Sequence, residues 1–83
     1  MHAKSIDLDD RPRDFGDRLL EERKRLGLAV HELAHLAGVT DYQQKRFENG
    51  TSTMPIDYLQ ALAKRSDVDV IYIVDGVRKL IPD

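Results

Sequence analysis

The run HELAH at residues 31–35 carries the two histidines and the glutamate of an HExxH pattern. On a helix, histidines four residues apart share one face and can bind zinc, while the glutamate between them can act as a general base. Catalytic zinc also needs a third protein ligand and a cleft. No histidine follows His35, and 83 residues leave little room for a cleft. We therefore expect no enzyme, no metal site and no cofactor. Adventitious zinc at the histidine pair stays open, and a metallohydrolase is a remote alternative.

A second group of side chains suits the reading of DNA bases. Gln43 can form two hydrogen bonds with an adenine and Arg46 two with a guanine, each pair contributing about 1–3 kcal/mol of discrimination. Close to them in sequence, Tyr42 could contact a thymine methyl or a phosphate. Asp41 could accept a hydrogen bond from a cytosine amino group, or act only as a partner of the helix dipole. The sequence thus offers four candidate base-reading residues within one short segment.

These side chains need a rigid support, and the pattern of residues 33–50 predicts two short helices joined by a tight turn. Small apolar residues at i, i+1 and i+4 give the first helix a narrow buried stripe. Gly38 suits the left-handed end of that helix, and Thr40 supplies an N-cap hydroxyl for the second. Asn49-Gly50 then stops the second helix. Two closely crossing helices with long polar side chains on the second are typical of a helix-turn-helix.

Length and composition limit the classes of protein to consider. A chain of 83 residues predicts one small domain, and the absence of cysteine fits a cytoplasmic location. No apolar run approaches the roughly 20 residues that cross a bilayer, and the first residues lack the apolar core of a signal peptide. The net charge is −2, yet residues 18–50 hold six basic and five acidic side chains. This near balance predicts weak non-specific binding to nucleic acid.

The run LGLAVHELAHLAGVTDYQQKRFENG, followed by a proline-initiated helix containing LQALA, resembles the lambda-type repressor and Cro family (XRE family) of phage and bacterial DNA-binding proteins. The resemblance covers residues 15–76. It implies an all-α fold of five helices whose third helix, residues 41–49, enters the major groove of double-stranded DNA. It also implies a bacterial transcriptional regulator, most naturally a phage or prophage repressor, that binds an operator.

The same resemblance implies roles for further residues. Arg23 should form a partly buried ion pair with Glu48, tying the first helix to the third. The loop after residue 50 should lie along the DNA backbone, although each hydroxyl in it could equally serve a simple turn. The residues expected to contact phosphates are Lys45, Asn49, Thr51, Ser52 and Thr53.

Three positions depart from the residue types that are usual in the family. Ala29 replaces the usual N-cap residue of the second helix, at a cost of about 0.5–2 kcal/mol. Val30 replaces a glutamine that commonly holds a phosphate. Gln44 stands where relatives place an apolar residue, so we expect a buried amide that must be hydrogen-bonded. In this register His31 and His35 lie on the surface.

The flanking segments complete the predicted fold. A helix should begin near Asp10 and end at Gly27, and Pro55 should open a fourth helix with Leu59, Leu62 and Ala63 buried. The segment VDVIYIVDG is rich in β-branched residues, and this composition favours a strand. The resemblance favours a fifth helix between Asp69 and Gly76. We choose the helix, with residues 68, 70, 73 and 74 facing inward.

This register leaves large apolar side chains in water on a small domain, which indicates a partner surface. We expect a homodimer through Ile71, Tyr72, Val77, Leu80 and Ile81. The predicted organisation is a disordered arm at residues 1–10, the DNA-binding domain at 11–76 and a tail at 77–83.

The sequence therefore predicts a homodimeric, sequence-specific regulator of a near-palindromic operator, with no membrane and no small-molecule ligand as partner. The alternative is a protein-interaction domain that kept the fold and lost DNA binding.

Overall fold

The structure, a computed structural model, describes residues 11–78 of the chain. This part contains five helices, joined by turns and loops, and no strand. The helices are α1 (Arg11–Arg25), α2 (Val30–Ala37), α3 (Asp41–Glu48), α4 (Ile56–Arg65) and α5 (Val70–Asp75). This confirms the predicted all-α class with five helices. The predicted arm at residues 1–10 and the tail residues Leu80 and Ile81 lie outside the described residues.

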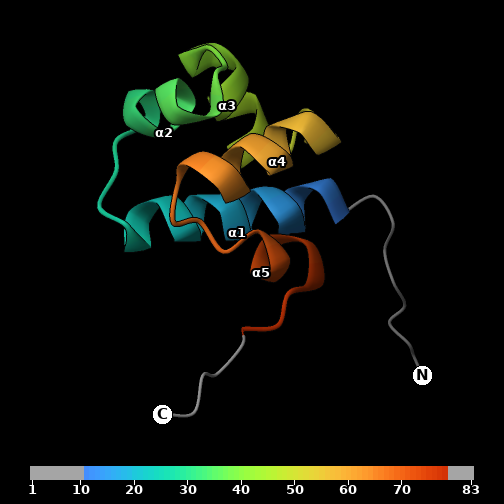
Figure 1. The fold of residues 1–83 in the computed structure, drawn as a ribbon. Helices are drawn as coiled ribbons and strands as arrows, with labels where there is room; N and C mark the ends of the chain where they lie inside the picture. Colours follow the sequence, from blue (N-terminus) through green and yellow to red (C-terminus); the bar gives the residue numbers. More distant parts are fainter. Residues whose placement is uncertain (1–10, 79–83) are drawn as a thin grey trace, which may run out of the picture.

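The longest helix, α1, runs through the middle of the fold (Figure 1). Helices α2, α3 and α4 lie on one side of it and α5 on the other (Figure 1). α1 packs against α3 and α5, α2 packs against α3 and α4, and α4 also contacts α5. The two helices that flank the turn at residue 38 therefore rest on α1 and α4, which form their support.

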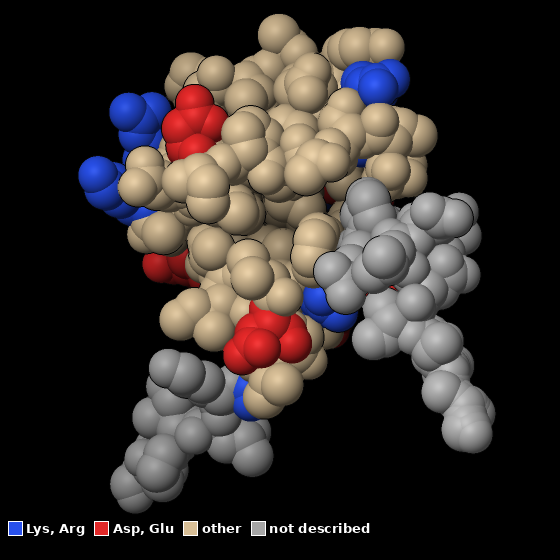
Figure 2. All heavy atoms as spheres, turned by 90° about the vertical axis from the view of Figure 1, so that its right-hand side faces the viewer, with Lys and Arg blue, Asp and Glu red and all other residues tan. Residues whose placement is uncertain are grey.

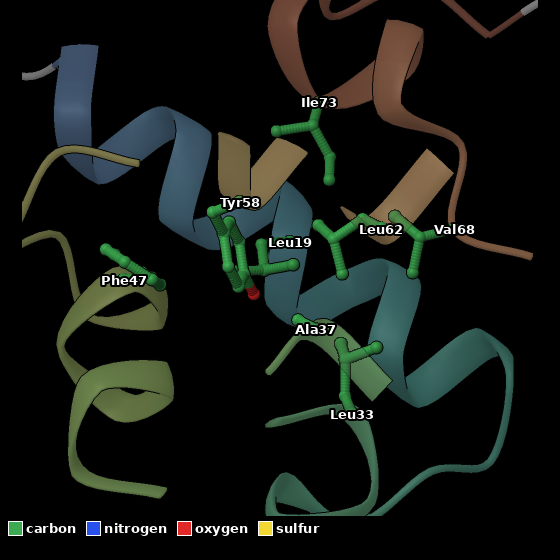
Figure 3. Packing of buried hydrophobic residues seen from close by; sticks show 8 residues of the cluster. All are labelled: Leu19, Leu33, Ala37, Phe47, Tyr58, Leu62, Val68 and Ile73. Carbon is green, nitrogen blue, oxygen red and sulfur yellow. The ribbon is translucent and has the colours of Figure 1, made fainter. Parts of the chain in front are cut away.

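The apolar core lies where all five helices meet. Figure 3 shows Leu19, Tyr58 and Leu62 converging there, with Ile73 approaching from α5. The buried cluster consists of Leu19, Leu33, Ala37, Phe47, Tyr58, Leu62, Val68 and Ile73. The predicted burial of Ala63 is wrong. The inward face of α4 is set by Tyr58 and Leu62, four residues apart, and this turns Ala63 toward solvent.

The segment after α4 is a helix, as predicted, and not a strand. The Asp69 carboxylate accepts a hydrogen bond of 2.9 Å from the Tyr72 N–H, and Gly76 ends the helix with φ +79°. These two caps satisfy the backbone of a six-residue helix whose composition favours β structure. Val74 was predicted to face inward but is 53% exposed. Only Ile73 of α5 is fully buried, because so short a helix presents about one turn to α1.

Tyr72, which the sequence predicts to face outward, is half-buried. Its hydroxyl donates to Glu21 Oε1 at 2.5 Å, and the Arg78 guanidinium stacks 3.9 Å from its ring centroid. The ring is therefore partly covered by its own chain. Sequence periodicity does not show this, because it does not place Arg78 against α1. A role of Tyr72 in a dimer stays a prediction.

A glycine inside α1 permits an unusually close approach of α3. A Cβ atom at Gly16 would lie 2.5 Å from the Phe47 carbonyl oxygen and 2.6 Å from that of Glu48. Both contacts are to backbone, which cannot move aside cheaply. The C-terminal end of α3 therefore rests directly on the backbone of α1.

Gly16→Ala tests this close approach. In an exposed helix, replacing glycine by alanine stabilises by up to about 1 kcal/mol. Here we expect the opposite sign, a loss of about 1–3 kcal/mol of unfolding free energy, because the methyl group overlaps backbone atoms. Urea unfolding monitored by circular dichroism measures it, with the exposed neighbour substitution Asp17→Ala as control. A Gly16→Ala variant more stable than the parent would contradict the packing of α1 on α3.

Glu22 is a fully buried carboxylate at the contact between α1 and α5. Both its oxygens accept from Arg25 at 2.8 Å, one accepts from the Asp69 N–H at 2.7 Å, and Arg78 lies 2.7 Å from the other. Burial alone would raise the pKa of Glu22, but the hydrogen bonds from Arg25, Asp69 and Arg78 outweigh it and lower the pKa to about 2. Charge and hydrogen bonding therefore attach the start of α5 to α1.

The lowered pKa of Glu22 predicts a dependence of stability on pH. A folded-state pKa below the unfolded value means that the contribution is present above about pH 4.5 and is lost as the pH falls toward about 2. The loss should reach at most about 3 kcal/mol. Urea unfolding of the parent and of Glu22→Gln between pH 2 and 7 isolates it. The difference in unfolding free energy between the two should shrink with falling pH, and a constant difference would contradict the assignment.

Candidate nucleic-acid interface

The turn between α2 and α3 has the local geometry that the sequence predicts. Gly38 adopts φ +77°, and the next N–H, of Val39, donates back to the Ala34 carbonyl at 3.0 Å. The Thr40 hydroxyl accepts from the Gln43 N–H at 3.0 Å and caps α3. The buried stripe of Leu33, Ala34 and Ala37 is also present. These contacts fix the direction in which α3 leaves the turn.

The glutamate of the HELAH run has a structural role at the start of α2. Ala29 has no side-chain acceptor for the first turn, but its own N–H donates to Glu32 Oε1 at 2.7 Å. This bond is half of a capping box and offsets part of the missing N-cap. His31 and His35 are exposed, as expected. Across residues 11–78 the histidine, aspartate and glutamate side chains form no cluster of three or more able to hold a metal ion.

A chain of buried polar groups holds α3 against α1 and α4. The predicted Arg23–Glu48 pair is present with two hydrogen bonds, Nε to Oε2 at 2.7 Å and Nη2 to Oε1 at 3.0 Å. Gln44 Nε2 donates to the same carboxylate at 2.8 Å, and the Tyr58 hydroxyl donates to Gln44 Oε1 at 2.6 Å. Gln44 is thus the buried, hydrogen-bonded amide that the sequence predicts. Tyr58, which ends the chain of bonds, was not anticipated.

Burial raises the pKa of Tyr58, so its hydroxyl stays protonated and remains a donor to Gln44. Its ring packs against Phe47 with centroids 4.4 Å apart. The side of α3 that faces the core is therefore held by both polar and aromatic contacts. Such fully satisfied networks favour one arrangement of the helices over others.

The opposite side of α3 presents two of the four predicted base-reading residues, Asp41 and Tyr42, and Tyr42 is 68% exposed. Lys45, a predicted phosphate contact, is exposed as well. Gln43 is half-buried and faces the start of α4. It forms part of the wall of a hollow of about 310 Å³, lined by Ala37, Gly38, Val39, Gln43, Phe47, Pro55, Asp57 and Tyr58.

Arg46 is half-buried and bonded to its own chain, which the sequence did not indicate. Its Nε donates to Ser52 Oγ at 2.8 Å and its Nη2 to the Thr51 carbonyl at 2.9 Å. Its Nη1 lies 3.5 Å from the Tyr42 hydroxyl, and the guanidinium carbon lies 5.7 Å from the centroid of that ring. The guanidinium that was predicted to meet a guanine is therefore engaged within the protein.

The loop after α3 also uses many of its donors internally. The Thr51 and Ser52 N–H groups both donate to the Arg46 carbonyl, at 3.0 and 3.2 Å, and the Thr51 hydroxyl reaches it at 3.3 Å. The Asn49 side chain lies against the Lys45 and Arg46 carbonyl oxygens, an arrangement that its amide nitrogen satisfies. Thr51 and Asn49 are thus poorly placed as phosphate donors. Lys45 and Thr53, both exposed, keep that potential, as does the Ser52 hydroxyl proton.

The face of the molecule in Figure 2 carries small groups of lysine and arginine side chains interspersed with small groups of aspartate and glutamate. Arg23 of α1 neutralises Glu48, so the remaining charged side chains of α3 are the exposed Asp41 and Lys45 and the half-buried Arg46. Any binding of DNA here would gain little from general attraction and would depend on local contacts.

A second exposed feature lies at the other end of the fold, on α5 and just beyond it. Ile71 and Val74 of α5 are both 53% exposed, and Val77, which follows the left-handed Gly76 at the end of the helix, is 62% exposed. They account for three of the five large apolar side chains exposed within residues 14–78. These three residues, the apolar stripe, differ from the predicted partner surface in that Val74 is included and Tyr72 is not.

Comparisons of this chain with protein-family models, with curated proteins and with solved structures found no match. Within residues 11–78 none of the helices has the length and apolar character required to cross a membrane.

Proposed function

We propose that the protein is a sequence-specific binder of double-stranded DNA, and that α2 and α3 form a helix-turn-helix of the lambda-repressor type. The observation that carries the proposal is the division of α3 into two sides. One side is fixed to α1 and α4 by the bonds of Glu48 and Gln44. The other presents Asp41, Tyr42 and Lys45, with Gln43 at its edge.

The dimensions of α3 suit the major groove. As an α-helix it is about 10–12 Å across with its side chains, which fits the roughly 12 Å width of that groove. Tyr42 and Gln43 stand near its N-terminal end, which is the end that approaches base edges in helix-turn-helix proteins. Lys45 and Thr53 flank them and are suited to the phosphates on either side. Regulation would then follow from occupancy of an operator, without chemistry by the protein.

A single copy offers few phosphate contacts, so useful affinity requires two copies. A two-fold dimer through Ile71, Val74 and Val77 would present two α3 helices to half-sites about 34–36 Å apart. Such a dimer buries the apolar stripe, which otherwise remains in water. The operator of the dimer should therefore be nearly palindromic.

Selection from a random pool of DNA duplexes tests the proposal. We expect an enriched near-palindrome whose binding weakens as salt is raised from about 50 to about 200 mM, with the shallow slope that a small number of phosphate contacts gives. Gln43→Ala should relax the preference at one position of each half-site by about 1–3 kcal/mol. Gln60→Ala, the same change at an exposed site on α4, serves as the control and should bind like the parent. No enrichment, or equal effects of the two variants, would refute DNA reading by α3.

Ile71→Asp tests the self-association surface. A charge within the apolar stripe should dissociate the dimer, because the carboxylate would be buried without a partner. Sedimentation equilibrium at micromolar concentration measures the mass. Ile56→Asp provides a matched control, since Ile56 is 71% exposed on α4 and lies outside the stripe. A dimer that survives Ile71→Asp and dissociates with Ile56→Asp would place the interface elsewhere.

The alternative, a protein-interaction domain with the same fold, is favoured by two observations. The net charge of the chain is only −2, and five large apolar side chains are exposed within residues 14–78. A domain of this kind would show no sequence preference in the selection experiment while keeping the stability and helical content of the parent.

A further inference from the structure

Arg46 occupies the centre of the loop that follows α3. Its guanidinium donates to the Thr51 carbonyl and to Ser52 Oγ, and its own carbonyl accepts from the N–H groups of both residues. Arg46 thus bonds both to the backbone N–H groups of Thr51 and Ser52 and to an acceptor oxygen of each of these two residues. We infer that Arg46 is a positioning residue of the interface, which shapes this loop and orients Tyr42, and that base reading falls to Tyr42 and Gln43. The inference rests on the proposed function.

The geometry of the guanidinium opposes a role in base reading. A guanine is recognised by two parallel N–H groups of one arginine. In Arg46 the Nε and Nη2 donors are both engaged within the protein, at 2.8 and 2.9 Å. Swinging the side chain into the groove would break these two charge-assisted bonds, so the gain from the guanine would be offset by a loss of the same kind. Arg46 therefore contributes more by staying where it is.

Tyr42 is the side chain whose orientation Arg46 restricts most. It is 68% exposed, so the core holds it weakly. The Arg46 guanidinium lies over its ring at 5.7 Å and has Nη1 within 3.5 Å of its hydroxyl. Cation–π contact and this long hydrogen bond restrict the ring to fewer orientations before any DNA is met. A base-reading side chain that is already oriented in the free protein loses less conformational entropy when it binds DNA.

Lysine cannot replace arginine in this role. A lysine keeps the positive charge but lacks the planar fork that donates to two acceptors at fixed angles. Arg46→Lys therefore separates positioning from attraction of phosphates. Ser52→Ala removes one of the two acceptors and leaves the charge untouched, so it should reproduce part of the effect of Arg46→Ala. Lys45→Ala, an exposed neighbour of the same charge on α3, is the matched control.

The first experiment needs no DNA. Amide hydrogen exchange of the free protein should show the Thr51 and Ser52 N–H groups exchanging about tenfold faster in Arg46→Ala and Arg46→Lys, and somewhat faster in Ser52→Ala. The amides of Phe47 and Glu48 within α3 should be unchanged, as should both loop amides in Lys45→Ala. Unaltered exchange of the two loop amides in Arg46→Ala would overturn the inference.

The second experiment uses the duplex enriched by selection and its single-base variants. A positioning role predicts that Arg46→Ala and Arg46→Lys weaken binding about tenfold, keep the salt dependence of the parent, and relax the base preference only at the position that Tyr42→Ala also relaxes. A changed preference at a position that Tyr42→Ala leaves unaltered would make Arg46 a base reader and overturn the inference. Rescue by lysine, with a shallower salt dependence in Arg46→Ala, would make it a phosphate contact and would also overturn it. If the parent enriches no sequence, the proposed function fails, and the exchange data alone decide whether Arg46 shapes the loop.

Discussion

The Glu48 carboxylate is the group on which the position of α3 depends. It ends α3 on the inner side, 8% exposed, and accepts hydrogen bonds from Arg23 of α1 and from Gln44 one turn earlier. A buried carboxylate without these donors would be strongly destabilising. The three side chains are therefore held in one arrangement, and Gly16 lets the backbones of α1 and α3 come close enough for it. Ridge-and-groove packing alone would permit several nearby angles; the polar bonds select one.

Arginine side chains also fix one element of the fold to another at several other places. Arg18 donates to the Ile73 carbonyl of α5 at 2.9 Å, Arg25 and Arg78 hold Glu22, and Arg46 binds the loop after α3. These guanidinium groups are engaged within the chain and contribute little to an outward positive field. The composition of residues 18–50 therefore overstates the attraction of this surface for phosphates. Affinity for a polyanion would have to come from a small number of well-placed contacts.

Sequence reasoning succeeded where a residue type has one local use. Gly38 and Thr40 were placed correctly because a left-handed backbone or a capping hydroxyl is satisfied within a few residues. Sequence reasoning missed contacts that depend on how the chain returns after a helix. Arg46 bonds to the loop that follows α3, and Tyr72 of α5 bonds to Glu21 of α1. Periodicity encodes neither contact. The Arg23–Glu48 pair was found only through resemblance to a family, since their spacing of 25 residues carries no local signal.

The two exposed surfaces are joined by a single rigid element. α1 holds the end of α3 through Arg23 and the end of α5 through Arg18, two arginines five residues apart on one helix. In the proposed mechanism α3 binds DNA and α5 contacts a second copy. Because α1 connects α3 to α5, it sets the distance between the two α3 helices of the dimer. A separation of one DNA turn tolerates little error, because a displaced second helix would miss its half-site. Under this proposal, the directional bonds of the charged groups along α1 would keep the helices in register, whereas apolar contacts alone would only hold them together.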